Sequence, residues 1–285
     1  MRHQTTMTTR SIPASLASVL EELELERPAI VTKETLGRLI ERAGLEQDPG
    51  QVASRLQSQG WLLTLRTRGA WEFAPASRAG PIGSGDPFIE LKATLSRRPG
   101  LPVAVAYDSA AWLHRLSQRV PTRHVLAIPS GENVPHALRM YRVTRQWGRL
   151  DFIEIQSLPV WRMETLITLI GAQPQSFRDW PNIGEWLSEA CDRLEPRLLL
   201  SELERRPRST WMRTGYILEA GGGIAIADHL RTLAPPGRGP FYLGSRDGSG
   251  RYDKKWEVMD SLLRFRRTRE VKVNSGQRQR RTGET

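Results

Sequence analysis

Three short amphipathic segments followed by two short apolar runs occupy residues 14–73, and this order constrains the fold more than any other feature of the chain. The first two segments repeat the i, i+3, i+4, i+7 apolar spacing of core-facing helices. These residues are Leu16, Val19, Leu20 and Leu23 in the first segment, and Leu36, Leu39, Ile40 and Ala43 in the second. A third helix is expected from Pro49 to Gln59. Three helices followed by a hairpin predict a winged helix-turn-helix.

Residues suited to begin and end helices flank these segments. Thr32 and Asp48 precede the second and third segments, where a side-chain oxygen can accept a hydrogen bond from a backbone N–H of the first turn. Pro49 stands at the first helical position, which tolerates proline. Gly44 and Gly60 follow the two segments, and glycine commonly ends helices.

The third helix carries the clearest functional pattern. Val52, Ala53 and Leu56 form a thin apolar face, and the opposite face is polar. That face holds Gln51, Ser54, Arg55 and Ser58. Glutamine and arginine can make bidentate contacts to adenine and guanine edges, and serine can reach bases or phosphates. A face that meets only water is the alternative, but the helix–helix–helix–hairpin order favours insertion into the major groove of DNA.

The expected hairpin pairs residues 61–65 with residues 70–73, and Gly69 supplies a positive φ at the turn. Arginines at its tip can meet phosphates or enter a minor groove, although such arginines also keep a sheet edge soluble. The residues expected to hold phosphates or the minor groove are Lys33, Thr35, Arg66 and Arg68.

Composition places the chain among cytoplasmic globular proteins. The 285 residues contain one cysteine, Cys191, which excludes an intramolecular disulfide and a cysteine-based zinc site. No apolar run reaches the roughly 18 residues of a membrane span, and residues 1–10 lack the apolar region of a signal peptide. We therefore expect no membrane association, no metal and no cofactor.

The net charge of +11 is unevenly distributed. Residues 1–75 carry nine basic and nine acidic side chains, whereas residues 264–285 carry eight basic and two acidic ones. The C-terminal segment is expected to be a basic, disordered tail that either adds salt-sensitive affinity for nucleic acid or only increases solubility.

Composition also predicts the domain boundaries. A winged-helix domain is expected at residues 11–75, a linker rich in proline, glycine and serine at 76–86, and a larger domain at 87–263. The larger domain is predicted to be mixed α/β, with strands early and helices late. A strand at 138–143 and a final strand pair at 241–243 and 255–258 are among its expected elements. The fold class is therefore α+β.

Motifs of catalysis are absent from the sequence. There is no Walker A loop, HExxH or GxSxG, and the five histidines lack metal-ligand spacing. His114 and His124 are interpreted as structural. Gly221-Gly222-Gly223 follows a helix rather than a strand, so it is interpreted as a helix end. Gly244-Ser245 resembles the start of a nucleotidyltransferase motif without the paired acids. We therefore expect a binding protein, not an enzyme.

Three stretches resemble the AbiEi-like antitoxins of bacterial toxin–antitoxin systems, in the two-domain, actinobacterial-type layout. The first is Leu56–Leu62 with the arginine-tipped hairpin. The second joins Ala106–His114 to Arg123–Pro129, and the third joins Thr214–Glu219 to Gly250–Trp256.

The resemblance implies a protein that represses its own operon by binding promoter repeats in double-stranded DNA. It also implies a C-terminal domain that neutralises a cognate toxin of nucleotidyltransferase type. Two alternatives stay open from the residues alone. One is a nucleic-acid-processing enzyme. The other is a protein-binding scaffold whose winged helix contacts protein, which the neutral charge of residues 1–75 would suit.

Overall fold

The computed structural model describes residues 14–78, 81–146, 151–247 and 250–263. Helices and three separate sheets form within these ranges, so the expected α+β class is confirmed. The chain divides into two compact units, residues 1–166 and 167–285. The predicted linker at 76–86 lies inside the first unit, and the basic segment 264–285 lies outside the described residues.

The first unit begins with helices at the expected places. They are η1 (Ala14–Leu16), α1 (Ala17–Glu26), α2 (Lys33–Arg42) and α3 (Pro49–Ser58). Thr32 Oγ1 accepts from the Thr35 amide at 3.2 Å, and Asp48 Oδ2 accepts from the Gln51 amide at 3.0 Å, as the N-cap predictions require. The apolar residues predicted on the three inner faces share one core, against which Ala43 packs partly buried.

A three-stranded antiparallel sheet completes this core. Its strands are β1 (Ile30–Thr32), β2 (Leu62–Thr64) and β3 (Ala70–Phe73), in the order β1-β3-β2. The hairpin pairs Leu62 with Phe73. Strand β1 was not predicted, because three residues are too few to show an alternating pattern, and it forms by pairing Ile30 with Glu72 of β3.

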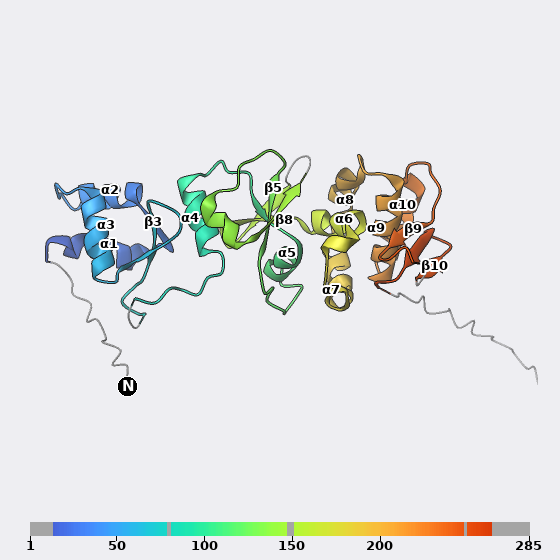
Figure 1. The fold of residues 1–285 in the computed structure, drawn as a ribbon, viewed down its shortest axis with the longest axis horizontal. Coiled ribbons are helices and arrows are strands. Elements are labelled where there is room, and N and C mark those ends of the chain that lie inside the picture. Colours follow the sequence, from blue (N-terminus) through green and yellow to red (C-terminus); the bar gives the residue numbers. More distant parts are fainter. Residues whose placement is uncertain (1–13, 79–80, 147–150, 248–249, 264–285) are drawn as a thin grey trace, which may run out of the picture. The chain divides into compact units, whose positions relative to one another are not determined.

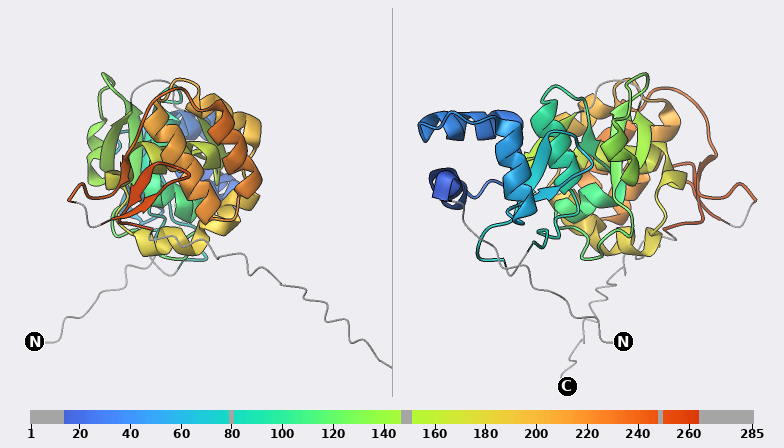
Figure 2. Two further views of the ribbon diagram at one scale, coloured as in Figure 1. Left: turned by 90° about the vertical axis from the view of Figure 1, so that its right-hand side faces the viewer. Right: turned by 60° about the vertical axis from the view of Figure 1, so that its left-hand side comes forward.

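Helix α4 (Ile89–Arg97) follows the linker and packs against β1 and β3, as Figures 1 and 2 show. Described linker residues lie against the same region. Arg78 Nη1 lies 3.0 Å from Glu72 Oε1, and the Ser84 amide donates to the same oxygen. The Glu72 side chain is buried, so these contacts supply the partners that a buried carboxylate needs.

The rest of the first unit is a mixed five-stranded sheet in the order β6-β5-β4-β8-β7. The strands are β4 (Ala104–Val105), β5 (Val125–Pro129), β6 (Arg142–Gln146), β7 (Phe152–Ile155) and β8 (Leu158–Trp161), with α5 (Tyr107–Leu113) packed on β5 and β8. The strand expected at 138–143 was misplaced. Residues His136–Met140 form the 3-10 helix η2, which buries Leu138, and the strand begins at Arg142.

The second unit is mainly helical. Its helices are α6 (Met163–Ala172), which begins in the first unit, η3 (Pro174–Ser176), α7 (Trp180–Asp192), α8 (Pro196–Leu203), α9 (Arg208–Ala220) and α10 (Ile224–Leu233). Gly221, Gly222 and Gly223 join α9 to α10, as predicted. Helices α9 and α10 pack side by side (Figure 1).

A small sheet follows these helices, in the order β10-β11-β9. Its strands are β9 (Phe241–Leu243), β10 (Arg251–Asp253) and β11 (Val258–Asp260). The strand expected at 255–258 begins only at Val258, because Asp253 Oδ1 accepts from the Trp256 amide at 3.0 Å and turns the chain there.

Candidate nucleic-acid interface

The polar face of α3, which consists of Gln51, Ser54, Arg55 and Ser58, is exposed. Burial of Val52, Ala53 and Leu56 in the core fixes the rotation of the helix and turns this face to solvent. Among the described residues, the side chains of Gln51, Ser54 and Arg55 have no hydrogen-bond or ion-pair partner, whereas Ser58 Oγ donates to the Arg55 carbonyl at 2.8 Å. Three of the four side chains are therefore available to an external ligand.

Lys33 lies where the start of α3 and the hairpin come together. Its side chain is exposed, and its amide donates to the Gly69 carbonyl at 3.3 Å. A Cβ on Gly50, in the first turn of α3, would lie 4.0 Å from Lys33 Nζ. The structure thus brings Lys33 beside both elements that were expected to contact DNA. Thr35 differs, since its half-buried hydroxyl lies 3.2 Å from Thr32 Oγ1 and takes part in the helix cap.

The hairpin turn, residues 65–69, exposes the side chains of Arg66 and Arg68. Gly69 has a φ of +74°, as the turn prediction requires. The backbone of this turn is held by Glu90 of α4, whose carboxylate accepts from the Arg66 amide at 2.6 Å and from the Thr67 amide at 3.2 Å. Sequence reasoning missed Glu90, because it lies beyond the linker and no local pattern relates it to the hairpin.

Arg97, another residue of α4, lies beside the turn. The Arg97 guanidinium pairs with Glu34 of α2, and a Cβ on Gly69 would lie 3.6 Å from Arg97 Nε. The hydrogen bond from Arg97, with further ones from the Glu34 backbone and Thr32, lowers the pKa of the Glu34 carboxyl from 4.5 to about 2. Arg97 therefore pairs with the acidic side chain that follows Lys33 in the first turn of α2. Sequence reasoning missed this residue as well.

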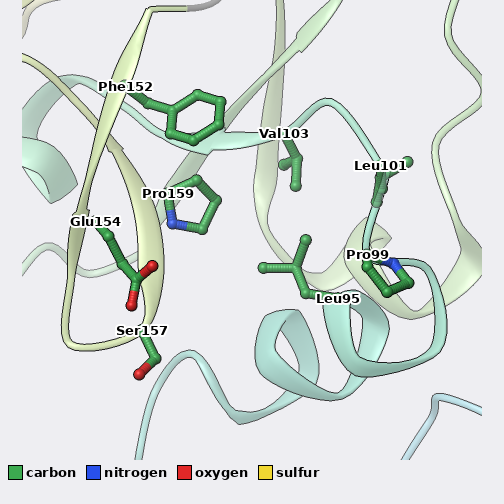
Figure 3. Close-up of a pocket in the computed structure, with 8 residues that line it drawn as sticks. All are labelled: Leu95, Pro99, Leu101, Val103, Phe152, Glu154, Ser157 and Pro159. Carbon is green, nitrogen blue, oxygen red and sulfur yellow. The ribbon is translucent and has the colours of Figure 1, made fainter.

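The first unit also holds a separate pocket of 280 Å³, shown in Figure 3. Apolar residues of α4 and the following loop face the hairpin of β7 and β8. The lining residues are Leu95, Pro99, Leu101, Val103, Phe152, Glu154, Ser157 and Pro159. Strand β7 is a sheet edge, and its Phe152 and Ile153 are exposed. The pocket can accept an apolar group, but its two polar side chains do not form an acid–base or nucleophilic arrangement.

His114 and His124, interpreted as structural from the sequence, are buried. His114 Nε2 lies 2.7 Å from the Trp161 carbonyl oxygen, and His124 Nδ1 lies 3.1 Å from Ser109 Oγ. Burial lowers the pKa of His124. Five tryptophans between residues 161 and 256 are buried: Trp161, Trp180, Trp186, Trp211 and Trp256. Within the described ranges, no group of three side chains could hold a metal ion, and no helix has the length and hydropathy of a membrane span.

The two stretches near the C-terminus that carry the sequence resemblance meet in the core of the second unit. Glu219 of α9 accepts from Lys255 Nζ at 2.5 Å and from Trp256 Nε1 at 2.7 Å. Tyr216 donates its hydroxyl to Asp260 at 2.7 Å. These contacting residues are buried or half-buried, so they pack the domain, whereas Arg251, Tyr252 and Lys254 of the same stretch are exposed.

Residues 103–220 match the family model "AbiEi antitoxin C-terminal domain", the antitoxin family that the resemblance predicted. The match of this domain suggests an antitoxin of a toxin–antitoxin system, with a toxin as its partner.

The structure is similar to the crystal structure of the RV2827C protein from Mycobacterium tuberculosis. The TM-score is 0.74 with 26% sequence identity, and the match covers 91% of this chain and 95% of that one. The comparison with curated proteins found no match.

Proposed function

We propose that the protein is a DNA-binding antitoxin that represses its own toxin–antitoxin operon and neutralises a cognate toxin of nucleotidyltransferase type. The observation that carries the DNA-binding part is the polar face of α3, where Gln51, Ser54 and Arg55 are exposed and lack partners among the described residues. Side chains of these types at successive turns of one helix suit the edges of base pairs in the major groove.

In this proposal residues 14–73 act as a winged helix-turn-helix, with α3 in the major groove and the β2–β3 hairpin as the wing. The order α1-β1-α2-α3-β2-β3 and the small antiparallel sheet support this interpretation. Lys33, Arg66 and Arg68 contact phosphates or the minor groove. The Thr35 hydroxyl lies within hydrogen-bond distance of Thr32 Oγ1 at the helix cap, and it would have to give up this contact to bind a phosphate.

A salt-titrated binding assay on the protein's own upstream DNA tests the regulatory part. We expect a preference over scrambled DNA of at least about 10³-fold, the lower end for specific regulators. Equal and steeply salt-dependent affinities for both sequences would show that positive charge alone binds DNA, and would contradict the proposed repression.

Co-expression with the product of the neighbouring toxin gene tests the antitoxin part. The full chain should restore growth, and so should the Arg55→Ala variant, because Arg55 is assigned to DNA and not to the toxin. If the toxin adds nucleotides to an RNA acceptor, labelled nucleotide incorporation in a lysate should rise on toxin expression and fall when the antitoxin is present. A toxin without such transfer would contradict the nucleotidyltransferase assignment.

A protein-binding scaffold is the second candidate. The equal numbers of basic and acidic side chains in residues 1–75 favour it, since tight DNA-binding modules are usually basic. The two candidates differ in one result: a scaffold would show no sequence preference in the binding assay and would still neutralise the toxin.

A further inference from the structure

The hairpin turn is held from outside its own sheet by a single buried carboxylate. Glu90 is 5% exposed, and its two oxygens accept three hydrogen bonds from two consecutive residues of the turn. Oε1 accepts from the Arg66 amide at 2.6 Å, and Oε2 accepts from the Thr67 amide at 3.2 Å and from Thr67 Oγ1 at 3.1 Å. Charge-assisted bonds of this kind are stronger than those between neutral groups.

Helix α4 reinforces this anchor over two further turns. Thr94, four residues after Glu90, places its hydroxyl 3.1 Å from Thr67 Oγ1. Arg97, three residues later, lies beside Gly69 and pairs with Glu34. Residues at i, i+4 and i+7 share one helix face. One face of α4 is thus directed at the hairpin turn, although α4 follows the linker and the sequence assigns it to the next domain.

We propose that Glu90 is a positioning residue for DNA binding, which orients the turn so that Arg66 and Arg68 face the nucleic acid. The DNA-binding unit then extends through α4. This inference rests on the proposed DNA-binding function. The physical reason is that the turn at residues 65–69, if unanchored, would have to be ordered during binding, at a cost in conformational entropy, whereas the anchored turn is ordered beforehand.

The Glu90→Gln variant of the full chain tests the inference. Glutamine has nearly the same shape, but its amide nitrogen is a donor and would meet either the Arg66 or the Thr67 N–H in place of an acceptor. In the free protein we expect the Arg66 and Thr67 amides to exchange hydrogen at least about tenfold faster, because a hydrogen bond to a charged acceptor is lost. The melting temperature reports separately on whether the fold survives.

The salt dependence of DNA binding gives the functional readout. The affinity falls as the salt concentration rises, and each lost phosphate contact makes the slope of log K against log salt concentration less steep by about 0.9. In the wild-type chain, Arg68→Ala should make the slope less steep by that amount. In the Glu90→Gln chain the same substitution should leave the slope nearly unchanged, because the turn no longer holds Arg68 toward the DNA. Arg55→Ala should weaken binding by the same factor in both backgrounds, since α3 has its own cap.

Glu72→Gln is the matched control. Glu72 is also 5% exposed and also holds a loop, but its partners are Arg78 and the Ser84 amide in the linker. In this variant Arg68→Ala should still make the salt slope less steep by about 0.9. General destabilisation would instead change the Arg68 contribution equally in both glutamine variants.

Each outcome decides the inference. An unchanged amide exchange, or an Arg68 contribution that persists in Glu90→Gln, would overturn it. Faster exchange together with loss of the Arg68 contribution would support it. If the wild-type chain shows no preference for its upstream DNA, the proposed regulatory function fails. The salt slope on any DNA and the exchange of the free protein still report on the anchor.

Discussion

Trp256 donates its indole N–H to the Glu219 carboxylate at 2.7 Å, and its ring covers the one glycine of α9, Gly215. A Cβ on Gly215 would overlap the six-membered ring of Trp256, which is 0% exposed. The helix and the late turn are therefore held together by a polar contact at one end of the indole and by close packing at the other.

Gly215→Ala should destabilise the second unit by about 1–3 kcal/mol, because an added methyl group in a full core forces neighbouring atoms to shift. Gly184→Ala in α7 is the matched control. No heavy atom lies within 4 Å of a Cβ built there, so alanine should stabilise the helix by about 0.5–1 kcal/mol. Calorimetric melting measures both variants, and equal effects would contradict the packing of Trp256 on Gly215.

Glu219→Ala should lower the free energy of unfolding by about 1.5–3 kcal/mol, since it leaves the buried indole N–H of Trp256 without its acceptor and removes a charged partner of Lys255. The control is Glu189→Ala, which removes an exposed i,i+4 pair with Arg193 worth about 0.3–0.5 kcal/mol. Urea unfolding followed by tryptophan fluorescence compares them. A Glu219 effect as small as the control would show that this contact adds little.

Arg55→Ala should weaken binding to the operator by about 1–3 kcal/mol if Arg55 makes a bidentate base contact, and should relax the preference at one position of the site. Arg42→Ala removes the same charge from the end of α2, where Arg42 pairs with Glu26, and should change the affinity little. Titration of labelled operator DNA measures both. An operator affinity unaltered by Arg55→Ala removes this residue from the base-reading set.

Arg66→Ala and Arg68→Ala should weaken binding to operator and scrambled DNA by similar factors. Each should flatten the salt slope by about 0.9, because phosphate contacts do not depend on sequence. Binding measured at several salt concentrations checks this. A slope equal to that of the wild-type protein would show that the hairpin turn does not touch DNA.

Arg97→Ala should raise the pKa of Glu34 from about 2 toward 4.5, because the side-chain hydrogen bond from Arg97 is the largest cause of the depression. A depressed carboxyl pKa contributes stability above pH 4.5, and that contribution is lost as the pH falls toward 2. The Glu34 side chain is 66% exposed, so the contribution should stay below about 1 kcal/mol. An NMR titration of the Glu34 carboxyl carbon gives the pKa, and a value still near 2 in the variant would contradict the assigned cause.

Local patterns in the sequence determined the helices of residues 14–58, their Thr32 and Asp48 caps and the positive φ at Gly69. Capping, periodicity and turn conformation depend on residues only a few positions apart. The rotation of α3 followed from the same patterns, and with it the exposure of Gln51, Ser54 and Arg55. The helical character of the later part of the larger domain was predicted from the sequence as well.

Only the tertiary structure decided which distant residues meet. Strand β1 exists through its pairing with β3, and β9 lies parallel to β11 although 14 residues separate their ends. Glu90 reaches Arg66 across 24 positions, and Trp256 reaches Glu219 across 37. Such contacts leave no periodic trace in the chain, because each depends on the packing of whole elements. The proposed DNA surface is therefore visible in the sequence of α3, whereas its anchor on α4 becomes visible only once the chain is folded.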